Sequence, residues 1–81
     1  MIDDRPRILE RYIRRKLLAD KTLPLTADTP LVSEGIVDSM GLVLLAAFVE
    51  EQFGVRIDDA DIRAGEIETI RDILALVDRR R

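Results

Sequence analysis

The residues with the clearest chemical potential are Asp38 and Ser39, which stand just before the apolar stretch "MGLVLLAAF". A serine hydroxyl can be a covalent attachment point, and an aspartate beside it can guide an enzyme that modifies it. Both residues are also ordinary helix caps, because their side-chain oxygens accept hydrogen bonds from free backbone N–H groups. The pair by itself therefore leaves two interpretations open, a helix cap and a modification site.

The residue inventory excludes several kinds of chemistry. The chain of 81 residues contains no cysteine and no histidine. A disulfide scaffold, a cysteine nucleophile, the usual zinc sites and a Ser-His catalytic arrangement are therefore excluded. No base partners the serine and no cluster of metal ligands stands out, so we expect no catalytic residue, no metal site and no enzyme activity. Any thiol chemistry must use a sulfur from another molecule.

Length and composition predict one small folded domain over residues 1–81. The chain is 47% hydrophobic and 36% charged, which is typical of a compact domain rather than a disordered segment. No apolar run approaches the roughly 20 residues of a membrane span. The N-terminal "MIDDRPR" does not resemble a signal peptide. We therefore expect a monomeric cytoplasmic protein that does not contact a membrane.

The net charge of −3 is unevenly distributed along the chain. Residues 1–19 contain six basic and three acidic side chains, whereas residues 20–72 contain four basic and twelve acidic side chains. The basic stretches "RRKLLADK" and "DRRR" are interpreted as solvated helix ends. They are too small and too far apart in the sequence to predict a nucleic-acid partner.

Apolar periodicity predicts the first two main helices. The first runs from about Arg5 to Ala19, since proline follows its first residue and apolar residues then recur at helical spacing. The second begins at Asp38 or Ser39 and ends near Phe53, because Gly54 is a natural helix stop.

The rest of the chain predicts a long loop, a short helix and a third main helix. A single helical turn is expected from Asp59 to Arg63, and Thr69 with Asp72 resembles a capping box that opens the last helix. No sustained period appears from Asp20 to Val37, so this segment is a loop held by its own apolar residues. These are Leu23, Leu25, Leu31, Val32 and Ile36. The predicted fold is an all-α, small four-helix bundle with a long loop between its first two helices.

The second main helix carries two apolar stripes. The core stripe follows helical spacing and consists of Leu42, Leu45, Ala46, Val49 and Phe53. Met40, Leu44 and Ala47 form a second stripe on another face, which is more apolar surface than a one-sided helix requires. An exposed apolar patch beside Asp38 and Ser39 indicates a docking surface.

At these residues the chain resembles the acyl carrier protein family, including its peptidyl and aminoacyl carrier members. The resemblance covers nearly the whole chain. It rests on the Asp38-Ser39-Met40 motif at a helix start, "EEQFGVRI" at the end of that helix, a short acidic third helix, and "ETIRDIL" at the start of the last helix.

The resemblance implies that Ser39 receives a 4'-phosphopantetheine group from coenzyme A, added by a magnesium-dependent phosphopantetheinyl transferase. The terminal thiol of this arm then holds acyl or aminoacyl intermediates as thioesters, which accounts for the missing cysteine. The positive end of a helix also suits a phosphodiester. The implied partner-recognition residues are Asp38, Met40, Leu44, Ala47, Glu50, Glu51 and Ile62.

One departure from the family bears on the pathway. The corresponding helix of fatty-acid carriers is acidic from its first turn, whereas here Gly41 and Leu44 stand where acids are common. The resemblance therefore favours a stand-alone carrier of a polyketide or nonribosomal peptide pathway. Its partners would be an adenylating acyl or aminoacyl ligase or an acyltransferase, and downstream biosynthetic enzymes. The alternatives are a carrier of fatty-acid synthesis and an unmodified helical adaptor in which Ser39 is only a cap.

Gly41 is unusual inside a helix, where glycine costs roughly 0.5–1 kcal/mol relative to alanine. Two explanations remain open: the missing side chain leaves room for a partner or for the arm, or the position is exposed and neutral. On either explanation, we expect Gly41→Ala to raise thermal stability.

Overall fold

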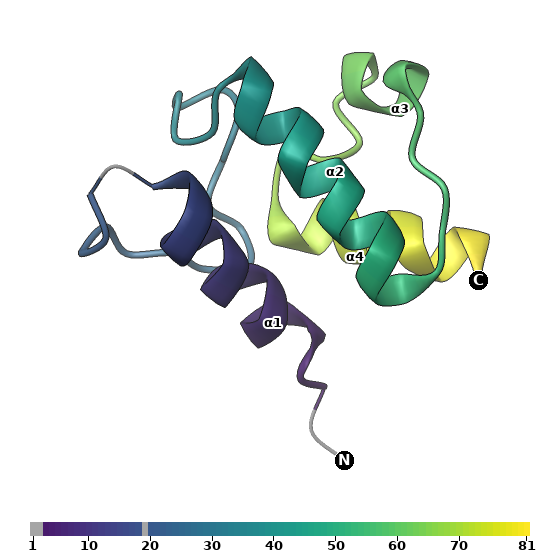
Figure 1. Ribbon diagram of the computed structural model, residues 1–81, viewed down its shortest axis with the longest axis horizontal. Coiled ribbons are helices and arrows are strands. Elements are labelled where there is room, and N and C mark those ends of the chain that lie inside the picture. The colour runs from purple at the N-terminus through teal and green to yellow at the C-terminus, as the bar shows by residue number, and fades with distance from the viewer. Residues whose placement is uncertain (1–2, 19) are drawn as a thin grey trace.

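The computed structural model describes residues 3–18 and 20–81, and within these ranges it contains helices, turns and loops but no strand. The elements are α1 (Arg5–Tyr12), η1 (Ile13–Leu17), α2 (Ser39–Phe53), α3 (Asp59–Arg63) and α4 (Ile70–Arg80). In Figure 1, α1 and α3 lie on opposite sides of α2, and α4 lies behind α2. The predicted all-α architecture of three main helices and one short helix is confirmed. No helix in this part of the chain is both long and apolar enough to cross a membrane.

The first helix is shorter than predicted, and its end is irregular. The α-helical part stops at Tyr12, and η1 continues it as a wider π-helical turn in which the Leu18 N–H donates to the Ile13 carbonyl at 3.1 Å. Leu18 then adopts an extended backbone, with ψ of 131°, and its side chain is buried. The helix therefore ends before Leu18, because this residue turns into the core, and Ala19 lies outside the described residues.

The core is built from α1, α2 and α4, and loop residues complete it. α1 packs against α4. Tyr12 of α1 stacks on Phe48 of α2, with ring centroids 3.9 Å apart and an angle of 15° between the planes. The largest fully buried side chains are Leu9, Ile13, Leu31, Leu45, Val49, Ile67, Ile70, Ile73, Leu76 and Val77. In the predicted core stripe of α2, Leu45, Ala46 and Val49 are buried, whereas Leu42 and Phe53 are only partly buried.

The long loop before α2 is held by Glu68, which precedes α4. The Glu68 carbonyl accepts from the Leu31 N–H at 2.8 Å, and its carboxylate accepts from the N–H groups of Val32 and Ser33, each at 3.0 Å. The bonds from Ser33 and Val32 to the carboxylate lower the pKa of the Glu68 carboxyl. Leu31 is buried as predicted, but Val32 is 37% exposed, so the loop is held by the Val32 backbone and not by its side chain. The other predicted anchors are partly buried: Leu23, Leu25 and Ile36.

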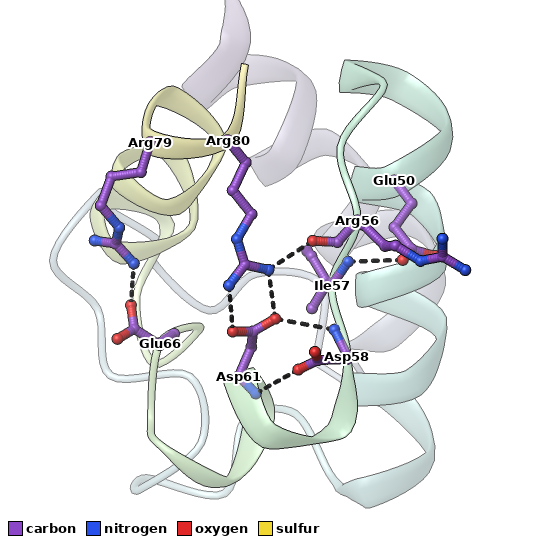
Figure 2. A network of polar contacts seen from close by, with 8 residues as sticks. All are labelled: Glu50, Arg56, Ile57, Asp58, Asp61, Glu66, Arg79 and Arg80. Atoms are coloured by element: carbon purple, nitrogen blue, oxygen red, sulfur yellow. Dashed lines mark hydrogen bonds and ion pairs between the residues drawn. The ribbon is translucent and has the colours of Figure 1, made fainter.

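A polar network joins α3 to the last turn of α4 (Figure 2). Asp58 and Asp61 form a reciprocal capping box at the start of α3, with N···O distances of 3.0 and 2.9 Å. The Arg80 guanidinium donates to both carboxylate oxygens of Asp61, each at 2.6 Å. Arg80 and the backbone N–H of Asp58 hold the pKa of the buried Asp61 carboxyl well below its usual range. Because of this network, α3 is fixed against α4 although it has only five residues.

The capping box expected at Thr69 and Asp72 is half formed. The Thr69 hydroxyl oxygen accepts from the Asp72 N–H at 3.0 Å, and no reciprocal bond from the Asp72 side chain accompanies it within the described residues. The full box lies at α3 instead, where an aspartate takes the place of the usual glutamate.

Gly41 is buried at the point where α2 meets the preceding loop. A Cβ atom at this position would lie 2.8 Å from Cγ1 of Val37 and 3.2 Å from Oδ1 of Asp38. Val37 is itself buried and β-branched, so it has little freedom to move away. Packing within the chain therefore accounts for the glycine. It also favours a loss of stability on Gly41→Ala, in place of the gain expected from helix propensity.

We predict that Gly41→Ala lowers the free energy of unfolding. Overpacking costs about 1–3 kcal/mol, and the better helix propensity of alanine returns up to about 1 kcal/mol. The net loss of about 1 kcal/mol corresponds to a Tm decrease of about 4–8 °C, which circular dichroism can measure. In a Val37→Ala background the clashing methyl is absent, so the same substitution should become neutral or stabilising. A Gly41→Ala protein that melts above the unsubstituted chain would contradict this account.

A second prediction concerns Asp61 and Arg80. We expect Arg80→Gln to destabilise the chain more than Arg79→Gln, because Arg79 pairs with the more exposed Glu66. The pKa of Asp61 is lower in the folded chain than its ordinary value of 3.8, so its stabilising effect is complete above that pH and is lost as pH falls further. Urea unfolding at neutral and acidic pH should show the Arg80→Gln deficit shrinking below about pH 3.8. A deficit that is independent of pH would point to lost packing instead.

Candidate functional site

The first turn of α2 places Ser39 immediately after a cap. Asp38 has an extended backbone, and its Oδ1 accepts from the Gly41 N–H at 2.7 Å. Asp38 is therefore the N-cap, and Ser39 is the first residue of the helix. Asp38 therefore stabilises the start of α2. From the sequence, its value is expected in recognition by a modifying enzyme. The Ser39 hydroxyl takes no part in capping.

Ser39 is exposed, and its hydroxyl forms no hydrogen bond within residues 3–18 and 20–81. It borders a hollow of about 240 Å³ between α2 and α3. The other lining residues are Leu42 and Val43 of α2 and Asp59, Ile62 and Arg63 of α3. The fold thus brings Ile62 to the same hollow as Ser39, although the two are far apart in the sequence.

The outward face of α2 is apolar. The exposed fractions are 67% for Met40, 58% for Val43 and 45% for Leu44, and Ala47 is also exposed. The expected exposure of the second stripe is confirmed. Val43 was missed by the sequence reasoning, although it follows Met40 by three residues and therefore shares its face.

The two glutamates near the end of α2 differ in their surroundings. Oε2 of Glu50 accepts from the Ile57 N–H at 2.7 Å and so holds the segment that leads to α3 (Figure 2). Glu51 is exposed, and no ion pair to it occurs within the part of the chain that the structure describes. Glu50 therefore has a structural role, and Glu51 is the carboxylate available to a partner.

The hydroxyl of Ser39 has few polar neighbours. No carboxylate or other base accepts a hydrogen bond from the Ser39 hydroxyl among the described residues. The same residues contain no group of acidic side chains arranged to hold a metal ion. A serine nucleophile needs an adjacent base, and the described residues place none against this hydroxyl.

Comparison with known proteins agrees with this geometry. Residues 8–77, from α1 to α4, match the protein family described as "Phosphopantetheine attachment site". The "Acyl carrier protein" of Thermotoga maritima is 34% identical over 72 residues, which are 89% of this chain and 85% of that protein. No solved structure matches the chain. The chain therefore belongs to the phosphopantetheine attachment family and is a non-catalytic acyl carrier protein homologue with 4'-phosphopantetheine as its cofactor.

Proposed function

We propose that Ser39 is the residue to which the 4'-phosphopantetheine arm is attached. The contrast between the chain's two serines carries this proposal. The Ser33 hydroxyl lies 3.2 Å from the Glu68 carboxylate and donates to it, in a loop tied to α4. The Ser39 hydroxyl is exposed at the start of α2 and has no such acceptor within the described residues. Ser39 is therefore the serine that a transferase can reach without displacing a hydrogen bond to Glu68.

The surroundings of Ser39 fit a phosphodiester. The positive end of the α2 dipole favours an anion there by roughly 0.3–1 kcal/mol when exposed. Asp38 adds a negative charge, but its Oδ1 is already bound to the Gly41 N–H. Arg63 adds a positive charge at the same hollow, and Leu42 and Ile62 give it apolar walls. When attached, the group supplies the thiol that the chain lacks, and this thiol holds the cargo as a thioester.

As a family member, the chain works with a phosphopantetheinyl transferase and with biosynthetic enzymes. We infer that these enzymes recognise α2 mainly through its apolar face. The first turn of α2 contains no acidic residue. Of the two later glutamates, Glu50 is bound to the Ile57 N–H, whereas no partner for the Glu51 carboxylate occurs among the described residues. The exposed residues that would form the contact are Met40, Val43, Leu44 and Ala47.

This apolar recognition favours loading by an adenylating ligase or an acyltransferase of a natural-product pathway. A carrier of fatty-acid synthesis would depend more on charged contacts along α2. The cargo is an acyl or aminoacyl group. A cytoplasmic location, a monomeric state and a single carrier domain over residues 1–81 stay predictions.

The attachment site can be tested by intact mass after co-expression with a phosphopantetheinyl transferase. We expect the unsubstituted chain and Ser33→Ala to gain the mass of one arm, and Ser39→Ala to gain none. Because Asp38 and not Ser39 caps α2, Ser39→Ala should change the free energy of unfolding by less than about 0.5 kcal/mol. A Ser39→Ala protein that still gains the arm would move the site elsewhere. An unsubstituted chain that stays unmodified would favour the adaptor alternative.

The recognition surface can be tested with Leu44→Glu and Glu51→Ala in the arm-bearing protein. We expect Leu44→Glu to slow acylation by a purified loading enzyme about tenfold, or roughly 1.4 kcal/mol, because it places a charge in an apolar contact. Glu51→Ala should slow it less. Circular dichroism would verify that both proteins are equally folded. If Glu51→Ala slows acylation more than Leu44→Glu does, charged contacts and not apolar ones dominate recognition by the loading enzyme.

A further inference from the structure

A second hollow, separate from the one at Ser39, lies where α1 meets α2. Its volume is about 210 Å³. The apolar part is formed by Ile8, Tyr12 and Phe48, and the two aromatic rings are stacked. The polar part is entirely basic and consists of Arg11, Arg15 and Lys16. The hollow thus combines an aromatic floor with three cations from one helix and its continuation.

These three cations are not used by the fold. Arg5 pairs with Asp3 and Asp78, and Arg14 pairs with Glu10. Arg11, Arg15 and Lys16 are exposed, and the structure shows no ion pair or side-chain hydrogen bond for them across residues 3–18 and 20–81. Two basic side chains of the first helix, Arg5 and Arg14, therefore support the fold, whereas Arg11, Arg15 and Lys16 line the hollow.

The spacing of Arg11 and Arg15, together with Arg7, works against helix stability. These three arginines follow one another at intervals of four residues, and like charges at this spacing repel each other. Asp4 borders a neighbouring hollow with Arg7 and Arg11 but forms no ion pair with either within the described chain. Repulsion among these arginines thus lowers the stability of the isolated chain, and an acidic partner would relieve it.

We propose that the hollow between α1 and α2 binds an acidic segment of a partner protein. An apolar side chain of the segment fills the space above Tyr12 and Phe48, and its carboxylates pair with Arg11, Arg15 and Lys16. This surface lies outside the attachment site and does not depend on Ser39. It also differs in charge from the middle of the chain, because residues 20–72 carry twelve acidic and four basic side chains. An acidic partner is therefore attracted to α1 and repelled by this acidic middle part.

The geometry favours a protein segment over a lipid surface. A helix that binds a membrane needs a broad apolar face, whereas Ile8, at 36% exposure, is the one large apolar side chain that the described part of α1 exposes. A concave site with an aromatic floor accepts a single inserted side chain. A peptide can insert one, whereas the surface of a bilayer is flat. The Tyr12 hydroxyl also donates to the Leu44 carbonyl at 3.4 Å, so the hollow adjoins the exposed face of α2. A partner bound on α2 can thus extend onto α1.

The proposal is tested with a synthetic helical peptide whose leucine and phenylalanine face is flanked by glutamates. NMR titration of the full chain should shift the resonances of Ile8, Tyr12 and Phe48. The double variant Arg11→Gln/Arg15→Gln should weaken the Kd roughly fivefold to tenfold, as expected for two exposed ion pairs. Arg56→Gln removes one exposed positive charge away from the hollow and should change the Kd less than about twofold. A peptide with glutamine in place of glutamate should bind the unsubstituted chain at least as weakly as the acidic peptide binds the double variant, which keeps Lys16.

Four outcomes would overturn the proposal. These are an absence of shifts at the hollow, equal weakening by Arg56→Gln, tighter binding to vesicles of phosphatidylcholine and phosphatidylglycerol, and a dimer in sedimentation that Arg11→Gln/Arg15→Gln abolishes. The titration is repeated with Ser39→Ala protein, which has the same hollow and no proposed attachment residue. Peptide binding by this variant separates the α1 surface from the attachment proposal, since either can fail without the other.

Discussion

The Asp38 cap is the constraint on which the position of Ser39 depends. Its hydrogen bond to the Gly41 N–H fixes where α2 begins. At the same turn, a Cβ atom on Gly41 would crowd the side chains of Val37 and Asp38. Packing around the cap therefore favours glycine at position 41, although glycine weakens the helix. Because Asp38 is the cap, the Ser39 hydroxyl is not needed for capping and remains available for the proposed attachment.

The elements that sequence reasoning predicted well are those governed by local rules. The bounds of α2 follow from a cap at Asp38 and a glycine stop at Gly54, which adopts the left-handed backbone expected there. The turn at α3 also lies where it was expected. The end of the first helix was less accurate, because the tertiary burial of Leu18 ended the helical spacing early. The exposed face of α2 was identified because helical spacing alone separates it from the core face.

The contacts that sequence reasoning missed join residues far apart in the chain. Glu50 was interpreted as a recognition residue, yet its carboxylate holds the Ile57 N–H. The pairing of Asp61 with Arg80 and the support of the loop by Glu68 were not foreseen, because all these groups are ordinary surface residues in the sequence. Charge alone does not reveal which acids have a structural role. That distinction requires knowing which backbone N–H groups the fold leaves without a partner, and the role of Gly41 likewise required the position of Val37.

The attachment of the long loop to Glu68 also determines how the molecule opens locally. The carboxylate of Glu68 holds the amides of Val32 and Ser33, while its own backbone carbonyl holds Leu31 next to the start of α4. Detachment of the loop and fraying of the first turn of α4 should therefore be linked, and we expect the two segments to exchange their amide hydrogens as one cooperative unit. The exchange rates of the Val32 and Ser33 amides should therefore report on the stability of α4, although neither residue belongs to that helix.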